Sequence, residues 1–250
     1  MPLPRTVRWS QGPGASHLPV GYAVVERIVN NATRTSTRAL GKITVAALDG
    51  VSLTVQRGEF LAIAGPSGSG KTTLLNLIGC LDTPTAGKIG IEKVPVARLS
   101  PGRRADLRAR KIGFIFQTFN LIPVLTAREN VEYPLLLQKR GDGAKGGVDA
   151  ALAQVGLADR GGHRPAELSG GQQQRVAIVR ALVTDPALVL ADEPTANLDG
   201  KTGQEIVELM RRLNRERGTT FIFSTHDSRI LKAADRVVEL VDGRVRPAGG

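Results

Sequence analysis

Cysteine and aromatic residues are scarce in this chain of 250 residues. The one cysteine, Cys80, rules out a disulfide within the chain, and a reducing cytosol suits such a composition. We expect Cys80 to be a buried, small apolar residue rather than a nucleophile. Phe, Trp and Tyr make up 4% of the residues, and none of them lies in the densest basic cluster, Arg98–Lys111. Although the formal net charge is +11, we expect no nucleic-acid partner, because base stacking needs aromatic side chains.

Long apolar runs are also missing. Phe60–Ala64 and Ala187–Ala191 are among the longest, and both are far shorter than the roughly 20 residues that a membrane-spanning helix needs. The first residues include Pro2 and Pro13 and lack the apolar stretch of a signal peptide. We therefore expect neither a membrane span nor export. Residues 1–20 have no hydrophobic period, which predicts a disordered tail.

Residues 21–246 have the pattern of a single α/β domain. β-branched residues dominate Tyr22–Ile28 and Ile43–Val55, with Asp49-Gly50 as a turn signal, and this predicts an N-terminal antiparallel β lobe. Beyond it, short apolar runs alternate with helical segments, which predicts a mostly parallel sheet covered by helices. The apolar runs are Phe60–Ala64, Ile112–Phe116, Leu188–Ala191 and Thr220–Ser224. A helical stretch over about 96–164 predicts an inserted α-helical subdomain.

A phosphate-binding loop follows the first of these apolar runs. The pattern G-x-x-x-x-G-K-[ST] stands between a predicted strand and a predicted helix, which is the context that such a loop requires. Backbone N–H groups and the helix N-terminus attract phosphates, the lysine reaches the β and γ phosphates, and the threonine offers a hydroxyl to Mg²⁺. The expected nucleotide contacts are Gly65, Pro66, Ser67, Gly68, Ser69, Gly70, Lys71, Thr72 and the adjoining Thr73.

Two carboxylates end the later run Leu188–Ala191. Asp192 is the candidate partner for the metal ion, together with Thr72. Glu193 comes one residue further, where a water could attack the γ-phosphate, and a carboxylate placed there can act as a general base. Beside a phosphate loop, this pair predicts nucleotide hydrolysis rather than an ordinary acidic turn.

A second glycine-containing segment, Leu168–Arg175, reads L-S-G-G-Q-Q-Q-R. Ser169 and Gln172 form the S-x-x-Q pattern of a capping box, so a helix should begin here with unpaired N–H groups that attract an anion. The box does not explain Gly170 and Gly171, which would leave space for a ligand. The segment therefore predicts a second anion-binding helix end.

This segment resembles the signature sequence of ABC (ATP-binding cassette) ATPases. The other family motifs occur in the expected order, namely Phe116-Gln117, Asp192-Glu193, Asn197-Leu198-Asp199 and Ser224-Thr225-His226-Asp227. The resemblance spans about residues 41–242 and implies a P-loop NTPase core that hydrolyses ATP with Mg²⁺.

The family also implies roles for particular residues. Gln117 would hold Mg²⁺ and the attacking water, and His226 would sense the γ-phosphate. The signature of one subunit would contact the ATP held by a second copy of the chain, so that two ATP molecules are enclosed in a dimer. The remaining residues expected to contact a nucleotide are Ser169, Gly170, Gly171 and Gln172 of the signature, and Asp199.

Further segments resemble the lipoprotein-releasing, macrolide-export and cell-division-associated subgroup. They are Leu77–Asp82, Gly113–Gln117, Phe119-Asn120-Leu121 and Asn130-Val131. The subgroup implies a separate integral-membrane permease as partner and a peripheral location on the cytoplasmic face of the cell membrane. The run Leu121–Leu125 is either a docking groove for that permease or ordinary core. Nucleotide-dependent regulation of a permease-like partner without transport is the alternative function.

One departure from the family concerns the adenine base. An aromatic residue usually precedes the segment matching Val45–Leu53, yet no aromatic residue occurs between Tyr22 and Phe60. Arg38 could stack on the base, a shifted alignment could bring in Tyr22, or no platform exists. Tyr22 would require about fifteen residues to loop out, so we favour Arg38 or no platform, with weakened ATP affinity and comparable use of GTP.

Overall fold

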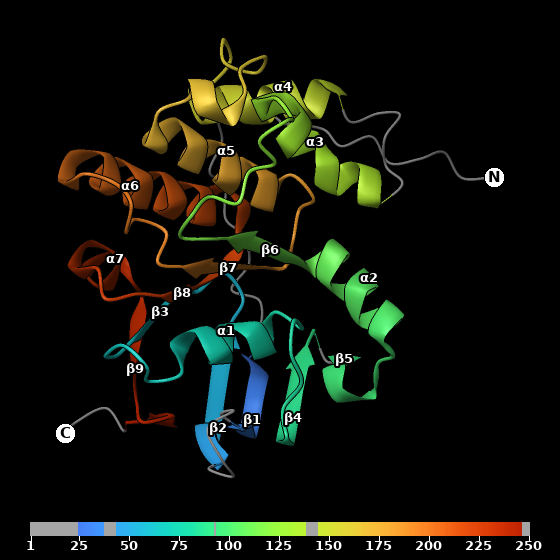
Figure 1. The fold of residues 1–250 in the computed structure, drawn as a ribbon, viewed down its shortest axis with the longest axis vertical. Helices are drawn as coiled ribbons and strands as arrows, with labels where there is room; N and C mark the ends of the chain where they lie inside the picture. The colour runs from blue at the N-terminus through green and yellow to red at the C-terminus, as the bar shows by residue number, and fades with distance from the viewer. Residues whose placement is uncertain (1–24, 38–43, 93, 139–144, 247–250) are drawn as a thin grey trace, which may run out of the picture.

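A computed structural model describes residues 25–37, 44–92, 94–138 and 145–246. The predicted tail at residues 1–20, Tyr22 and Arg38 lie outside these ranges. The described chain forms two sheets, with a group of helices stacked beyond the larger one (Figure 1).

The larger sheet has six strands in the order β10-β9-β3-β8-β7-β6. All neighbouring pairs are parallel except β9 with β10, so the predicted mostly parallel sheet is confirmed. The strands are β3 Phe60–Ala64, β6 Ile112–Ile115, β7 Leu188–Asp192, β8 Thr220–Ser224, β9 Arg236–Val241 and β10 Arg244–Val245. Parallel strands place their carboxyl ends at one edge of the sheet, where ligands of such folds bind.

The smaller sheet is antiparallel, with the order β2-β1-β4-β5, and this confirms the predicted β lobe. Its strands are β1 Val25–Thr37, β2 Thr44–Gln56, β4 Ala86–Ile91 and β5 Val94–Pro95. The turn predicted at Asp49-Gly50 is wrong, because both residues lie inside β2. There the pairing with β1 shifts register between Leu48 and Val51, so the dipeptide forms a bulge in one long strand.

Helices flank the larger sheet. They are α1 Lys71–Ile78, α2 Pro101–Lys111, α3 Ala127–Leu137, α4 Lys145–Gln154, α5 Gly170–Leu182, α6 Gly200–Arg217 and α7 Ser228–Ala233, with 3-10 turns at Val96–Arg98 and Pro165–Glu167. Helices α3, α4 and α5 gather at the top of Figure 1. The interval predicted as an inserted helical subdomain, 96–164, contains α2, α3 and α4 but also β6, which belongs to the larger sheet.

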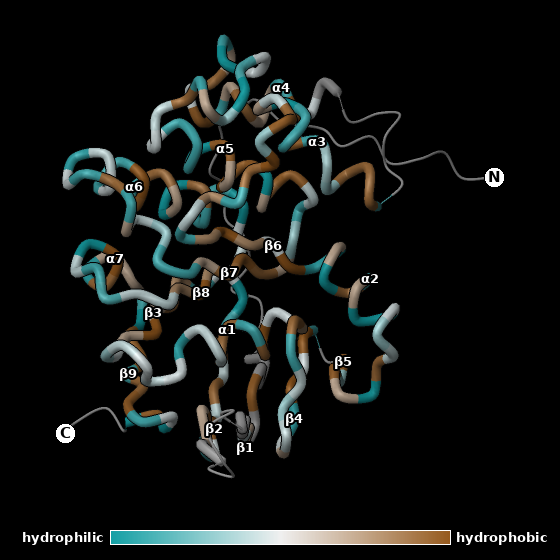
Figure 2. The backbone as a smooth tube through the Cα atoms, in the orientation of Figure 1, coloured by the Kyte–Doolittle hydropathy of each residue, from teal (hydrophilic) through white to brown (hydrophobic). Residues whose placement is uncertain are grey.

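Two hydrophobic cores lie on opposite faces of the larger sheet. Phe60 and Ala62 of β3 face the core shared with α5 and α6, whereas Leu61 and Ile63 face the core shared with α1 and the smaller sheet. Because both faces of the strand are covered, its sequence is a continuous apolar run. Figure 2 shows β6 and β7, the neighbouring strands of this sheet, as brown segments across the middle of the molecule.

The two cores contain a close contact between α5 and β6 and the buried Cys80. Helix α5 lies so close to β6 that a Cβ on Gly113 would be 2.3 Å from the carbonyl oxygen of Ala181. Cys80 is buried as expected, and burial raises the pKa of its thiol to about 11. The uncharged thiol is therefore favoured at neutral pH, in keeping with a small buried apolar residue.

Candidate active site

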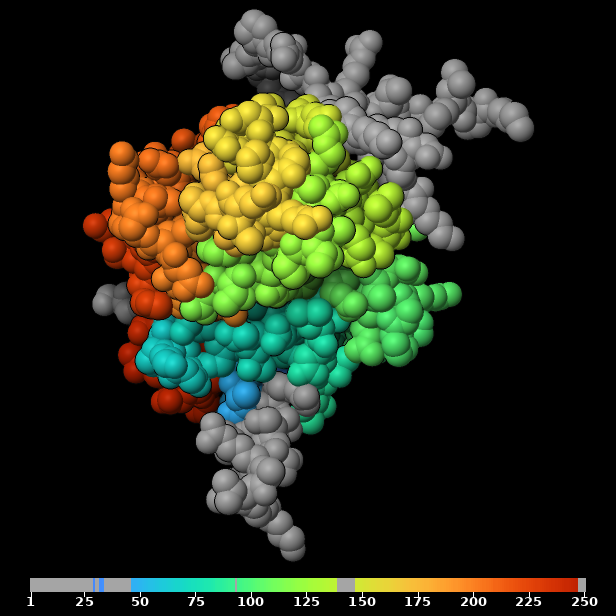
Figure 3. Space-filling model, turned by 45° about the horizontal axis from the view of Figure 1, so that its top comes forward, coloured from blue at the N-terminus to red at the C-terminus, as the bar shows by residue number. Residues whose placement is uncertain are grey.

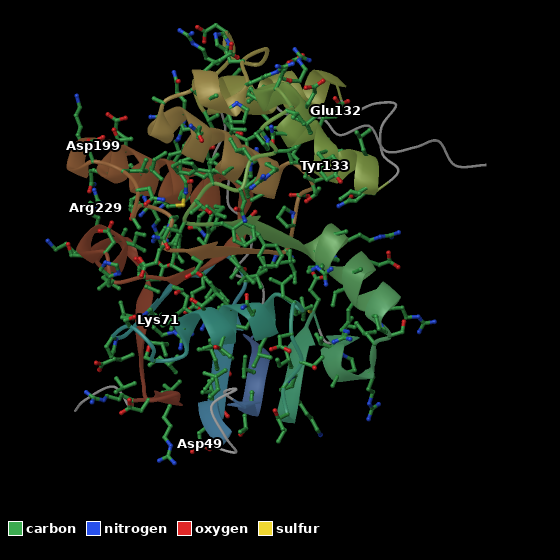
Figure 4. The ribbon with its side chains drawn as sticks, viewed as in Figure 1. Asp49, Lys71, Glu132, Tyr133, Asp199 and Arg229 are labelled. Atoms are coloured by element: carbon green, nitrogen blue, oxygen red, sulfur yellow. The ribbon has the colours of Figure 1, made fainter. Side chains whose placement is uncertain are left out.

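The phosphate loop joins β3 to α1 at the carboxyl edge of the larger sheet (Figure 4). Gly70 has a φ of 99°, in the left-handed region, and a Cβ there would lie 2.4 Å from the Ala47 carbonyl oxygen. Only glycine fits this position without displacing backbone. Lys71 bends over the loop, and its Nζ donates to the carbonyl oxygens of Gly65 at 2.7 Å and Pro66 at 3.0 Å.

A hairpin near the C-terminal end of the described chain supports this loop. The N–H of Gly243 donates to the Ser69 carbonyl oxygen at 3.0 Å, and the Gly243 carbonyl accepts from the N–H of Asp49 at 2.9 Å. Arg244 pairs with the Asp49 carboxylate at 2.6 Å. The turn between β9 and β10 thus connects the phosphate loop to β2. The sequence reasoning missed this support, although Asp242-Gly243 is a turn signal between two β segments.

Two of the three residues expected to hold the metal ion, Thr72 and Asp192, are 120 positions apart in the sequence and meet at the sheet edge. The hydroxyl of Thr72, in the first turn of α1, donates to Oδ2 of Asp192 at 3.2 Å. Asp192 ends β7, which is separated from β3 by β8. A hydroxyl and a carboxylate are oxygen ligands of the kind that Mg²⁺ prefers, so these two residues fit that ion.

Glu193 occupies the position just after β7 with a φ of 44°, which is strained for a residue with a long side chain. Its Oε1 lies 2.7 Å from Nδ1 of His226, and its Oε2 accepts from the Thr225 hydroxyl at 3.1 Å. The Glu193 side chain is 17% exposed and that of His226 is 77% exposed. The structure therefore joins two of the three predicted catalytic residues and adds Thr225, whose part the sequence did not indicate.

Gln117, the third predicted catalytic residue, follows β6 and is exposed. Its carbonyl oxygen accepts from Nδ2 of Asn197 at 2.9 Å. Asn197 stands two residues before Asp199, so the backbone at Gln117 is tied to the segment that leads into α6. Phe119 and Asn120, just beyond, both have positive φ, at 61° and 50°.

The signature segment begins α5, and the predicted capping box is present. The Ser169 Oγ accepts from the N–H of Gln172 at 3.3 Å, and the Gln172 Oε1 accepts from the N–H of Ser169 at 2.9 Å. A Cβ on Gly170 would touch Leu198 at 3.5 Å. A Cβ on Gly171 would lie 2.6 Å from Thr202 Cγ2, so α5 packs closely against α6 at this position.

Asp199 opens α6. Its Oδ1 accepts from the N–H groups of Lys201 and Thr202, each at 3.0 Å. Hydrogen bonds from Thr202 lower the pKa of the Asp199 carboxyl, with a smaller contribution from Lys201. Figure 4 shows Asp199 beside Arg229, away from Lys71. Within the described residues, no hydrogen bond or ion pair joins the signature segment or Asp199 to the phosphate loop.

A glycine-rich loop after a parallel strand, a hydroxyl beside a strand-end carboxylate, and a second carboxylate one residue further define a P-loop nucleotide hydrolase. The family model of the ABC transporter matches residues 48–196, and the chain belongs to this family. It is an ATP-binding subunit with the ATPase fold of that family.

Sequence identity to individual relatives indicates the subgroup of the family. The chain is 51% identical over 200 residues to the lipoprotein-releasing system ATP-binding protein LolD 1 of Rhodopseudomonas palustris. That alignment covers 79% of this chain and 88% of the relative. It is 48% identical over 217 residues to the macrolide export ATP-binding/permease protein MacB of Syntrophobacter fumaroxidans, covering 86% of this chain but 30% of that longer relative. The subgroup resemblance to lipoprotein-releasing and macrolide-export proteins is confirmed.

A solved relative shows the same fold. The cassette MJ0796 of Methanocaldococcus jannaschii, a dimer bound to ADP and Pi, matches with a TM-score of 0.81 at 44% identity. The match covers 89% of this chain and 97% of that one. Among the described residues, no helix has the length and apolar character to span a membrane.

Proposed function

We propose that this ABC ATPase works as a dimer of two identical chains around two ATP molecules and drives a separate membrane permease from the cytoplasmic face of the membrane. One observation carries the proposal. The phosphate loop and the signature helix are both built for an anion, yet within the described residues of one chain no hydrogen bond or ion pair joins them. A second copy supplies the missing half of each site, in keeping with the dimeric MJ0796 relative.

In this proposal the phosphate loop binds the β and γ phosphates through its N–H groups and Lys71. Thr72, Asp192 and Gln117 hold Mg²⁺, which neutralises charge on the phosphates when it is bound. Ser169 of the second copy, with the N–H groups of its α5, faces the γ-phosphate from the other side. This charge arrangement favours ATP over a nucleotide without the third phosphate.

Glu193 is proposed as the general base. It takes a proton from the attacking water as the water oxygen bonds to the γ-phosphorus and the bond to the β-γ bridging oxygen breaks, which leaves ADP and phosphate. The Thr225 hydroxyl and His226 hold the carboxylate through both oxygens, so its orientation is fixed. His226 is more exposed than Glu193, in keeping with the proposed contact to the γ-phosphate.

The proposed permease-binding surface lies on α3 and α2. Tyr133, Leu136 and Leu137 of α3 are 42%, 53% and 63% exposed. The α3 end contacts α2 directly, because Nε2 of Gln138 donates to the Ala109 carbonyl at 2.5 Å. Figure 3 shows the two helices side by side on one flank of the molecule.

The charge on α2 suggests what kind of segment binds there. None of its residues is buried, and its basic side chains are Arg103, Arg104, Arg108, Arg110 and Lys111. An amphipathic segment with an apolar face and acidic flanks would complement both helices. In the run Leu121–Leu125, Leu121 packs on the core whereas Val124 is 72% exposed, so only part of it is available for docking.

The dimer proposal is tested with Glu193→Gln protein, which should retain ATP without hydrolysing it. We expect light scattering to show a monomer without nucleotide and a dimer with Mg-ATP, and we expect added Ser169→Arg to abolish the dimer. Ser100→Arg is a matched control, since Ser100 caps α2 in the same way as Ser169 caps α5. A mass that does not respond to nucleotide would count against the proposal.

The permease partner is tested separately. Co-purification with a permease, with ATPase activity stimulated by its substrate, would support transport. Co-purification without such stimulation would favour the regulatory alternative.

A further inference from the structure

Arg180, near the end of α5, holds a loop that belongs to the active site. Its Nη2 donates to the Phe119 carbonyl oxygen at 2.7 Å, and its Nη1 donates to the carbonyl oxygen of Asn120. These residues directly follow Gln117 and Thr118. The close approach of α5 to β6 at Gly113 brings the guanidinium within reach of them.

The loop that Arg180 holds is strained. Phe119 and Asn120 are consecutive residues in the left-handed region, and although asparagine tolerates that conformation, phenylalanine rarely adopts it. The Thr118 hydroxyl donates to Oδ1 of Asn120 at 3.1 Å and adds one local contact. Such a conformation persists only where surrounding contacts hold it, and the two bonds from Arg180 are charge-assisted and therefore strong.

Placing Arg180 here costs free energy, because its charged guanidinium loses hydration. It is partly buried, and burial lowers the pKa of its guanidinium to about 10, although it stays charged at neutral pH. Within the described residues it pairs with no carboxylate. Its loss of hydration is thus offset by the two loop carbonyls rather than by a salt bridge, and a hydrophobic residue would pack the same space at lower cost.

We propose that Arg180 is a positioning residue for ATP hydrolysis, which fixes residues 118–120 so that Gln117 is presented to the metal ion and the attacking water. Because Arg180 lies on the helix that Ser169 begins, it also ties the Gln117 loop to the signature segment. This inference rests on the proposed role of Gln117. The Gln117 backbone is held at one side by Asn197 and, through the next residues, at the other side by Arg180.

The test is steady-state ATP hydrolysis by Arg180→Met protein, with ATP and Mg²⁺ varied independently. We expect kcat to fall roughly 10- to 100-fold, because a small displacement of a catalytic group lowers the reaction rate by factors of this size. We expect the Kd for a fluorescent ATP analogue to change less than about 3-fold, while half-maximal activity requires more Mg²⁺. A merely structural role would lower Tm without changing the Mg²⁺ requirement of the folded protein.

Arg217→Met is the matched control. Arg217, at the end of α6, also donates to a backbone carbonyl, that of Leu182, and burial lowers its pKa too. It donates to Leu182 and Gln154, neither of which belongs to the Gln117 loop, so we expect its loss to affect stability but not the Mg²⁺ requirement. Arg180→Lys keeps the charge but not the fork that reaches both carbonyls, and we expect an intermediate kcat. This variant carries the test if Arg180→Met does not fold.

A double-mutant cycle with Gln117→Ala distinguishes a failure of the Arg180 inference from a failure of the proposed role of Gln117. If Arg180 acts through Gln117, Arg180→Met should cost less than about 3-fold in kcat when Gln117 is already alanine. If Gln117→Ala lowers kcat but the two losses multiply, the inference is overturned and the role of Gln117 stands. If Gln117→Ala leaves kcat unchanged, the proposed role of Gln117 fails, and the inference fails with it.

Discussion

The phosphate loop and the signature segment, proposed to bind one nucleotide from two subunits, are held in place in opposite ways. The phosphate loop depends on backbone from distant parts of the chain, with Ala47 and Gly243 both touching it. The signature helix is capped by its own side chains, Ser169 and Gln172, three residues apart. A site held by long-range contacts is as rigid as the fold, whereas a locally capped helix end keeps its shape when the helix moves as a unit.

The largest effect should come from the phosphate-loop side. Replacing Glu193 with Gln removes the proposed base but preserves its shape, so turnover should fall roughly 10²- to 10⁴-fold while ATP binding is retained. Phosphate release in a steady-state assay measures the turnover, and filtration of labelled ATP measures the binding. Glu208→Gln, at an exposed position on α6, should behave like the unmodified protein. Unchanged turnover in Glu193→Gln protein would remove this residue from the mechanism.

A smaller effect should follow from loosening the long-range support. Gly243 has a φ of 74°, and a Cβ there would lie 2.8 Å from the Ala47 carbonyl oxygen. Gly243→Ala should therefore lower the free energy of unfolding by about 1–3 kcal/mol and weaken ATP binding several-fold. Thermal melting and an ATP titration measure the two effects.

Gly218→Ala provides the control for that experiment. Gly218 ends α6 with a φ of 62°, and a Cβ there would meet no atom within 4 Å. We expect this variant to lose stability through backbone strain without losing ATP affinity. If both variants weaken ATP binding equally, the hairpin contributes no specific support to the phosphate loop. The proposed difference between the phosphate loop, held by long-range contacts, and the locally capped signature helix would then be wrong.

The last effect concerns the base rather than the phosphates. Arg38→Tyr should tighten ATP binding and increase the preference for ATP over GTP, because a stacked aromatic ring contributes about 1–3 kcal/mol per base. Titrations with both nucleotides on both proteins measure this. Tight, ATP-selective binding that is insensitive at residue 38 but lost in Tyr22→Ala would restore an aromatic platform from upstream.

Short-range features and the motif residues of the site were predictable from the sequence, whereas long-range backbone contacts were not. The capping box of Ser169 and the strand before the phosphate loop depend on residues a few positions apart, and both are present. The turn expected at Asp49-Gly50 is a bulge, because pairing with β1 continues past it and the Asp49 N–H bonds to Gly243. A local pattern contains no information about such a partner.

The same limit applies to the site. Thr72, Asp192, Glu193 and His226 were indicated by motifs, and the structure brings them to one sheet edge. Arg180 was not indicated, because an arginine inside a helix is ordinarily a solvent-facing residue. Its importance depends on the φ angles of a loop about 60 positions away in the sequence.

The hairpin contact has a consequence for synthesis on the ribosome. Asp49 and Arg244 are 195 positions apart. A chain made at about 5–20 residues per second needs roughly 10–40 s to cover that distance, during which the nascent phosphate loop has no Gly243 beneath it. The nucleotide site is therefore one of the last parts of the domain to mature, and ATP cannot stabilise the early stages of its folding.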